Sequence, residues 1–256
     1  MALGSKEIEQ LVDRLDKAQT GVHDTVSLAD DADVDIDDAY RIQAGVVERR
    51  LGRGEKIVGV KLGFTSKAKM AQMGVSDVIV GRLTDAMRVD NGGEVELRRF
   101  IHPKIEPEVA YRLCRDVDLD DPDTDILSCV DAVASAMEII DSRYRDFRFT
   151  YTDVVADNTS AAAYVVGPWS ELRDVADLDV RMTVGAETVT GSTAAILDDP
   201  VNALHALLDM CRRRRIPLRA GDVVLAGAAT AAAPLTDTVA RCEIAGLGAV
   251  TVKGIA

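Results

Sequence analysis

The sequence predicts an α+β protein in which helices come first and a β-rich part follows. Apolar residues recur at helical spacing in two segments before residue 55. After about residue 85, short apolar runs alternate with glycine-containing turns, which is typical of a sheet. The chain has 256 residues, of which 47% are hydrophobic and 4% aromatic, so aliphatic side chains must build most of the core. This change from helical to strand-like sequence patterns predicts an N-terminal α/β part at residues 1–85 and a β-rich domain at 86–256, unless the two form one continuous domain.

The first part contains four predicted elements. Residues 5–19 and 36–51 each place apolar side chains on one helical face. The run KIVGVKLGFT is strand-like, although it carries glycines inside it, and a short helix at residues 67–73 is closed by Gly74.

In the second part, Asn91-Gly92 is a turn signal and predicts a hairpin between residues 87–89 and 95–97. The run HPKIEPEVAYRL alternates as a strand does. The remaining predictions are a helix at 124–134, a strand at 136–141, a hairpin at 182–192, a helix at 200–213, and β structure with glycine turns from 222 onward.

The net charge of the chain limits the classes of molecule that it is expected to bind. A formal net charge of −13 repels nucleic acid and anionic membranes, so we expect neither as a partner. It also repels an anionic substrate, which would need local cations. No apolar run approaches the roughly 18 residues needed to cross a bilayer, and no signal peptide is apparent. The four cysteines suggest neither a zinc site nor a disulfide framework, so free thiols in a reducing cytoplasm are expected.

Glu106 and Glu108 are the first candidate functional residues. In a strand, residues two apart project from one face, so both carboxylates point the same way. Two like charges this close repel each other unless a proton or a cation lies between them. Hard oxygen ligands suit Mg²⁺ or Mn²⁺. The competing interpretation is a pair of solvent-facing glutamates, and His102 could join a site here.

Three further features could carry chemistry. Glu138 lies in an apolar stretch, so it needs a buried partner, which is either a metal or Arg143. Lys61 lies between apolar residues and glycines, where a desolvated lysine can act as acid, base or carboxylate clamp; a lysine at a strand end is the alternative. The polar cluster from Asp157 to Ser160 is either a helix-capping turn or a carboxylate-binding loop.

Six motifs occur in a defined order: KIVGVKLGFTS, KMAQMGV, HPKIEPEVA, EIIDSRYRDFRF, VVADNTSA and GDVVLAG. Together they resemble the hydratase/decarboxylase group of the fumarylacetoacetate hydrolase superfamily, over nearly the whole chain. The resemblance implies a β-rich catalytic core of mixed β-roll or barrel form with a small N-terminal α/β part. It also implies a Mg²⁺ or Mn²⁺ ion held by Glu106, Glu108 and Glu138.

The same resemblance implies roles for other residues. It gives Lys61 a catalytic role and substrate contacts to Thr65, Ser66 and Ser160. In the mechanism that we expect, Ile79 lies by the leaving carboxylate, and Arg143, Arg145 or Arg148 binds the distal carboxylate. Members are typically cytoplasmic homo-oligomers that act on a small 2-oxo acid in the meta-cleavage route of aromatic catabolism. A complex with the hydratase of the same pathway is a further expectation.

Two activities compete within the group. Hydratases carry an Asp in a PDFG or PDYG stretch, whereas this sequence reads GVSDVIVG with Ile79 at the matching position. The resemblance therefore favours decarboxylation of 2-oxohex-3-enedioate over hydration of 2-hydroxypenta-2,4-dienoate, although Asp77 could replace the missing acid. A silent partner subunit is a third interpretation. An acylpyruvate hydrolase would need a water-activating His–Glu pair near the N-terminus, and His23 has no such setting.

Overall fold

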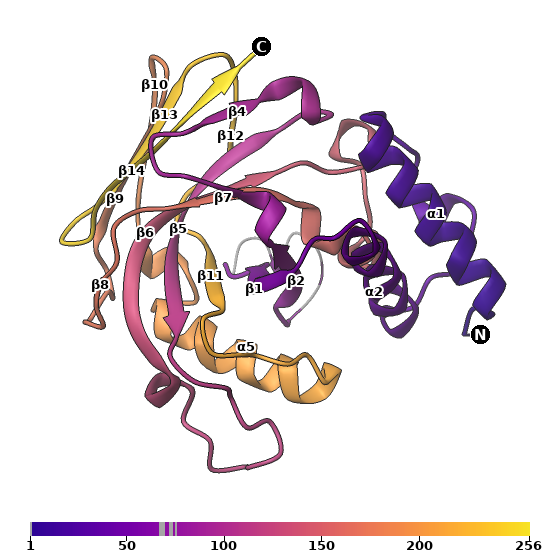
Figure 1. Ribbon diagram of the computed structural model, residues 1–256, viewed down its shortest axis with the longest axis horizontal. Helices are drawn as coiled ribbons and strands as arrows, with labels where there is room; N and C mark the ends of the chain where they lie inside the picture. Colours follow the sequence, from indigo (N-terminus) through magenta and orange to yellow (C-terminus); the bar gives the residue numbers. More distant parts are fainter. Residues whose placement is uncertain (1, 67–69, 72–73, 75) are drawn as a thin grey trace.

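Two curved sheets dominate the computed structural model, which describes residues 2–66, 70–71, 74 and 76–256. Within these residues, a nine-stranded sheet has the order β2-β1-β11-β5-β6-β7-β3, with β12 beside β5 and β8 beside β6. A five-stranded sheet has the order β10-β9-β13-β14-β4. Figure 1 shows β5 and β6 curving through the centre of the molecule, with the smaller sheet on one side and α1 and α2 on the other. The predicted α+β class is confirmed.

The larger sheet holds the strands that matter for the site. The helices are α1 (Ser5–Gly21), α2 (Ile36–Gly52), α4 (Tyr151–Ala156) and α5 (Pro200–Arg214). The strands of the larger sheet are β1 (Ile57–Gly63), β2 (Ile79–Thr84), β3 (Arg88–Val89), β5 (Lys104–Leu113), β6 (Val130–Ile140), β7 (Ala161–Val166), β8 (Ser170–Glu171), β11 (Val223–Ala228) and β12 (Ala233–Pro234). The smaller sheet contains β4 (Glu94–Glu96), β9 (Asp179–Val184), β10 (Glu187–Ser192), β13 (Val239–Ile244) and β14 (Gly248–Ile255).

Most of the predicted elements are confirmed. Both N-terminal helices, the strand around Lys61, the strand carrying Glu106, the hairpin β9–β10 and the helix α5 lie where the sequence placed them. The helix predicted at residues 67–73 falls largely outside the described residues. Because β1 and β2 pair within the same sheet as β11, residues before and after 85 share one sheet. The division into parts at residue 85 stays a prediction.

The helices α1 and α2 build a core of their own beside the larger sheet. The buried side of α1 consists of Ile8, Leu11, Val12, Leu15 and Ala18. These side chains pack with apolar residues of α2 and α4 and with Ile79 of β2. The N-terminus of α2 is capped by Asp35, whose carboxylate accepts from the Asp38 amide at 2.8 Å. The described helices include none long and apolar enough to cross a membrane.

Four consecutive arginines, Arg212–Arg215, close the C-terminal end of α5, and three of them pair with aspartates from elsewhere in the chain. Arg213 pairs with Asp77 at 2.5 Å, and Arg214 and Arg215 pair with Asp37 and Asp120. Cations at a helix C-terminus also complement the carbonyl end of its dipole. The run therefore closes a helix.

The hairpin predicted around Asn91-Gly92 is wrong in its pairing, although the turn itself forms. The Gly93 amide donates to the Asp90 carbonyl at 2.8 Å, and Gly92 has a φ of 81°. β3 pairs with β7 and β4 pairs with β14, so the two arms enter different sheets. The side chain of Asn91 accepts from the Thr251 amide at 2.9 Å, which holds the turn against β14. A local turn signal does not specify which strands its arms will join.

The helix predicted at residues 124–134 is also wrong. A short 3-10 turn, Ile126–Cys129, is followed by the long strand β6. Alanine favours helices, but this alanine-rich strand pairs with β5 on one side and β7 on the other. Ladder hydrogen bonds and burial on both faces outweigh the weak intrinsic preference.

We predict that Gly45→Ala destabilises the contact between α1 and α2. A Cβ atom at residue 45 would lie 2.5 Å from Cγ2 of Val12, which is buried and β-branched. Overpacking of this kind costs about 1–3 kcal/mol. Urea denaturation should show the loss in the free energy of unfolding.

The matched control is Gly52→Ala, because nothing lies within 4 Å of a Cβ atom at that end of α2. This variant should be neutral or slightly more stable, since alanine favours the helix. Equal losses in the two variants would contradict the packing explanation.

Candidate active site

Three glutamates meet at the centre of the larger sheet. Glu106 and Glu138 are directly opposite each other in the antiparallel pair β5–β6, and Glu108 lies on the same face of β5 as Glu106. One carboxylate oxygen from each residue lies within 4.8 Å of the others. Glu108 and Glu138 are completely buried, and Glu106 is half-buried. The structure thus brings together the three residues that the sequence singled out.

The electrostatics of this carboxylate cluster fit a divalent cation. Burial, followed by repulsion from Glu138 and Glu106, raises the pKa of Glu108 well above its ordinary value. Burial likewise raises the pKa of Glu138, against the opposing effect of Lys61. Oε1 of Glu108 and Oε1 of Glu138 are buried and accept no hydrogen bond from the described residues. Buried acceptors without donors suit Mg²⁺ or Mn²⁺, which bind carboxylate oxygens and offset the repulsion.

Lys61 supplies a cation beside these carboxylates. It lies in β1, opposite Gly81 of β2, where a side chain would crowd the lysine stem. Its Nζ is 2.9 Å from Oε2 of Glu138 and donates to the Thr159 carbonyl at 3.1 Å. Burial alone would lower the pKa of Lys61, but the neighbouring carboxylates, Glu138 foremost, outweigh it and leave the pKa raised. The buried lysine is therefore a positive charge held at a fixed place.

Gly227 and Thr65 support Glu108 from the other side. β11 is irregular between Leu225 and Ala228, and there the Gly227 amide donates to Oε2 of Glu108 at 2.7 Å. Gly227 has a φ of 111°, which only glycine adopts readily. A Cβ atom at this position would lie 2.0 Å from Oγ1 of Thr65. The close approach of Thr65 to the backbone of β11 thus requires glycine.

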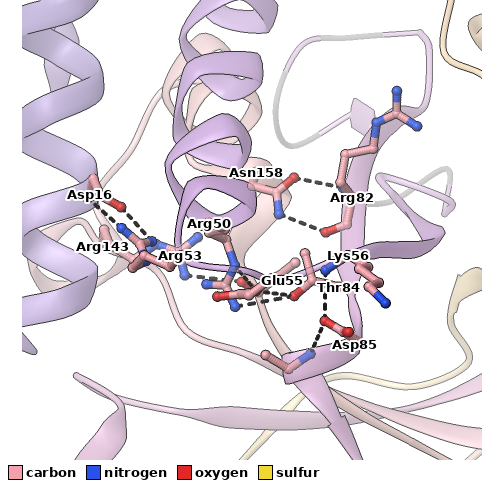
Figure 2. A network of polar contacts seen from close by, with 12 residues as sticks. Asp16, Arg50, Arg53, Glu55, Lys56, Arg82, Thr84, Asp85, Arg143 and Asn158 are labelled. Atoms are coloured by element: carbon pink, nitrogen blue, oxygen red, sulfur yellow. Dashed lines mark hydrogen bonds and ion pairs between the residues drawn. The ribbon is translucent and has the colours of Figure 1, made fainter.

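Three consecutive residues with positive φ form the turn that faces Lys61. Asn158, Thr159 and Ser160 have φ values of 47°, 56° and 58°. Each such non-glycine residue costs of order 1–2 kcal/mol, so the surrounding structure must hold the turn. The Asn158 side chain accepts from the Arg82 amide at 2.7 Å and donates to the Arg82 carbonyl at 2.9 Å (Figure 2). This anchor to β2 fixes the Thr159 carbonyl against the ammonium of Lys61.

Ile79 lies beside this turn. It is fully buried in β2 opposite Gly63, and a Cβ atom at Gly63 would be 2.8 Å from both Ile79 and Thr159. The two side chains therefore meet close to Lys61, and Ile79 is the apolar one of the pair. Asp77, the acid that could have replaced a hydratase carboxylate, pairs with Arg213 at 2.5 Å.

Arg143 is held by partners within the chain. Its guanidinium donates to Asp157 and to the carbonyls of Asp157 and Ala161, and the arginine and Asp157 are both buried. Burial raises the pKa of Asp157 to about 6, although Arg143 opposes the shift. The pair holds the chain between β6 and the 158–160 turn, and a contact of Arg143 with substrate stays a prediction.

The other predicted residues occupy intermediate positions. Ser160 is buried in the turn, and its carbonyl accepts from the Asp141 amide at 2.9 Å. Ser66 is half-buried directly after Thr65. The ring of His102 packs on Phe147 with centroids 4.5 Å apart, and His102 is not part of the carboxylate cluster.

The sequence did not reveal how two residues, Gly227 and Asn158, support the site. Gly227 ends the GDVVLAG motif, and a glycine inside a strand is a signal for a bulge or a close backbone approach. Asn158 belonged to the polar cluster, but its partner is the backbone of a strand 76 residues earlier. The first could be found from the sequence, whereas the second depends on the tertiary fold.

Comparisons with known proteins agree with this geometry. Residues 56–253 match the family described as fumarylacetoacetate (FAA) hydrolase C-terminal. A 4-oxalocrotonate decarboxylase from a Pseudomonas species is 44% identical over 248 residues, covering 96% of this chain and 97% of that protein. A 2-keto-4-pentenoate hydratase from Paraburkholderia xenovorans is 37% identical over 224 residues, covering 85% and 83%.

A solved structure is also closely similar. The 4-oxalocrotonate decarboxylase of Pseudomonas putida G7, complexed with magnesium and adipate, superposes with a TM-score of 0.92 at 34% identity. The superposition covers 99% of both chains. The fold expected from the sequence motifs is therefore confirmed.

We predict that Gly227→Ala weakens Mg²⁺ binding at least tenfold, because the added methyl group displaces Thr65 and the amide that holds Glu108. A lost hydrogen bond to a charged group costs about 1.5–3 kcal/mol, which corresponds to tenfold or more in affinity. Isothermal titration calorimetry with Mg²⁺ measures the change directly.

Gly221→Ala is the matched control. Gly221 also has a positive φ, of 89°, but nothing lies within 4 Å of a Cβ atom there. This variant should lose stability through backbone strain and keep its Mg²⁺ affinity. If both variants lose affinity equally, the contact with Thr65 is not the cause.

Proposed function

The chain belongs to the fumarylacetoacetate hydrolase family, and we propose that it is a metal-dependent carboxy-lyase. Its substrate would be 2-oxohex-3-enedioate (4-oxalocrotonate), and its products 2-hydroxypenta-2,4-dienoate and CO₂. The observation that carries this proposal is the buried carboxylate cluster with Lys61 beside it, in a chain 44% identical to a 4-oxalocrotonate decarboxylase.

Glu106, Glu108 and Glu138 are the proposed metal ligands. The magnesium of the related decarboxylase structure and the unpaired buried oxygens of this cluster support Mg²⁺, with Mn²⁺ as an alternative. When bound, the cation supplies Lewis acidity to the 2-oxo acid end of the substrate. The Gly227 amide keeps Glu108 in place for this role.

Lys61 is the proposed catalytic residue. Loss of CO₂ breaks the bond between C5 and C6, and its electron pair moves through the conjugated carbons to the C2 oxygen. A fixed ammonium aimed at that oxygen stabilises the developing charge and donates the proton that completes the enol. The Thr159 carbonyl holds Nζ of Lys61 and thereby sets its direction. Thr65, Ser66 and Ser160 are proposed contacts for the substrate.

Ile79 is proposed to face the departing carboxylate. An apolar wall there avoids repelling the anion, and it releases neutral CO₂ into a dry surrounding. The ion pair between Asp77 and Arg213 supports this choice, because it leaves no carboxylate from that segment to position water.

Hydration of 2-hydroxypenta-2,4-dienoate is the second candidate. The observation that favours it is 37% identity with a 2-keto-4-pentenoate hydratase. Both activities use the same carboxylate cluster, so they differ only at the distal carbon, where a hydratase needs a polar group near Ile79.

The proposal extends to the setting of the enzyme. A cytoplasmic homo-oligomer that associates with the hydratase of the same meta-cleavage pathway would pass on the unstable dienol product. Four unpaired cysteines are compatible with a reducing compartment.

The decisive experiment supplies the purified protein and Mg²⁺ with each substrate in turn. We expect CO₂ release from 2-oxohex-3-enedioate and no water addition to 2-hydroxypenta-2,4-dienoate. The measurements are CO₂ capture and the loss of dienol absorbance. Hydration without CO₂ release would establish the hydratase instead, and inactivity with both substrates would favour a silent subunit.

We predict that Glu108→Gln lowers kcat/KM at least a thousandfold and abolishes Mg²⁺ binding, since a neutral amide is a poor ligand for a hard cation. The control is Glu187→Gln on the exposed strand β10, which should keep full activity. A Glu108→Gln variant with unchanged rate and unchanged metal dependence would show that the ligand assignment is wrong.

A further inference from the structure

A cavity of about 730 Å³ is lined by the cations Lys104, Arg145 and Arg148 and by the carboxylates of Asp30 and Asp146. Its walls include Phe64, Phe147, Phe149, Lys104 and Arg148. Its size falls in the range of small-molecule sites. Among the described residues, neither Lys104 nor Arg148 forms an ion pair, although the chain has a net charge of −13 and most other exposed arginines have acidic partners. Three cations against two carboxylates give this cavity a net positive lining in an acidic protein, which favours an anion.

Lys104 is held at a defined distance from the proposed metal ligands. It begins β5 and lies on the same face as Glu106, two residues along the strand, which is about 7 Å. Its ammonium rests 3.9 Å from the ring centroid of Phe147, which directs it toward the cavity. Phe64, on the opposite wall, directly precedes Thr65, which packs on Gly227. Two of the residues that line the cavity, Lys104 and Phe64, are therefore close in sequence to residues of the site, Glu106 and Thr65.

We infer that this cavity binds the second carboxylate of a 2-oxo dicarboxylic acid, with Lys104 and Arg148 as its ligands. Five carbon–carbon bonds of about 1.5 Å span about 6 Å in an extended six-carbon diacid, which matches the separation along β5. The aromatic walls contact the carbons between the two ends. This assignment rests on the proposed function and specifies how the far end of the substrate is selected.

The chemistry also sets which kinetic constant the subsite controls. The distal carboxylate carries its full charge when the substrate binds and loses that charge as CO₂ departs. Cations that contact it therefore stabilise the bound substrate more than the transition state, so they lower KM without raising kcat. Lys104→Met should raise KM about tenfold and leave kcat equal or higher, because a hydrogen bond to a charged group contributes that order of affinity to the bound substrate.

The test compares two inhibitors that differ only at the far end: 2-oxoadipate, a diacid, and 2-oxohexanoate, a monoacid. Their binding to the Mg²⁺-loaded full-length protein is measured by calorimetry. We expect wild type to prefer 2-oxoadipate, and we expect Lys104→Met and Arg148→Met to lose about tenfold in 2-oxoadipate affinity while binding 2-oxohexanoate as wild type does. Retained binding of the monoacid shows that the variants are folded and keep the metal site.

Arg241→Met is the matched control, because Arg241 is an exposed arginine of β13 that pairs with Glu243 at 3.1 Å and does not line the cavity. It should change neither affinity more than threefold. If Lys104→Met binds neither acid, Lys104→Arg must restore the preference for the diacid, and failure to do so overturns the assignment.

The remaining outcomes separate the two proposals. Equal affinity of wild type for both acids, or equal losses for both acids in the variants, overturns the subsite even if CO₂ release establishes the decarboxylase. A diacid preference that depends on Lys104, in a protein that releases no CO₂, supports the subsite and contradicts the proposed function. A wild type that binds neither acid in the presence of Mg²⁺ overturns both.

Discussion

Three mutually repelling carboxylates lie at the centre of one sheet, and this constraint governs the elements around them. Cross-strand pairing puts Glu106 directly opposite Glu138, and the alternation of β5 adds Glu108 to the same face. Because two of these side chains are completely buried, water cannot screen their charges. Such a cluster is stable only when cations or protons offset its charge. The described part of the chain places Lys61 beside it and leaves buried acceptor oxygens on Glu108 and Glu138 for a further cation. The fold therefore holds at its centre a carboxylate cluster that a divalent cation would stabilise.

Neighbouring elements satisfy this constraint through backbone conformations that are unfavourable in isolation. The irregular stretch of β11 aims the Gly227 amide at Glu108, and the three-residue turn at 158–160 aims a carbonyl at Lys61. Each requires positive φ, and each is contacted from another segment of the chain: by Thr65, which follows β1, in one case and by the backbone of Arg82 in β2 in the other. Strain concentrated around a charged cluster is what preorganisation of a site requires. It also explains why the small helical core of α1, α2 and α4 packs against β2, since β2 carries that anchor.

Much of this could be predicted from the sequence, and the failures have physical causes. Periodicity located both N-terminal helices and the strand of Glu106, and the position of Glu138 in an apolar run indicated its burial, because both are local properties. The hairpin at Asn91-Gly92 failed because a turn motif does not fix strand partners, and the 124–134 helix failed because pairing on both edges of β6 outweighed alanine's preference. Arg143 pairs with the chain's own Asp157, a partner that the sequence did not indicate. Which charge pairs with which is decided by the tertiary fold.

The carboxylate cluster leaves the choice of reaction to the other end of the substrate. Any 2-oxo acid can present the same two oxygens to a cation, so the cluster does not distinguish a diacid from a monoacid. Discrimination must come from groups about 7 Å farther along β5, where Lys104 and Arg148 line the cavity. A cation there favours binding of a second carboxylate, whereas an apolar wall such as Ile79 favours its departure as neutral CO₂. These two requirements oppose each other at one carbon. The fold resolves them by placing the cations on β5 and the loop after β6, and the apolar wall on β2.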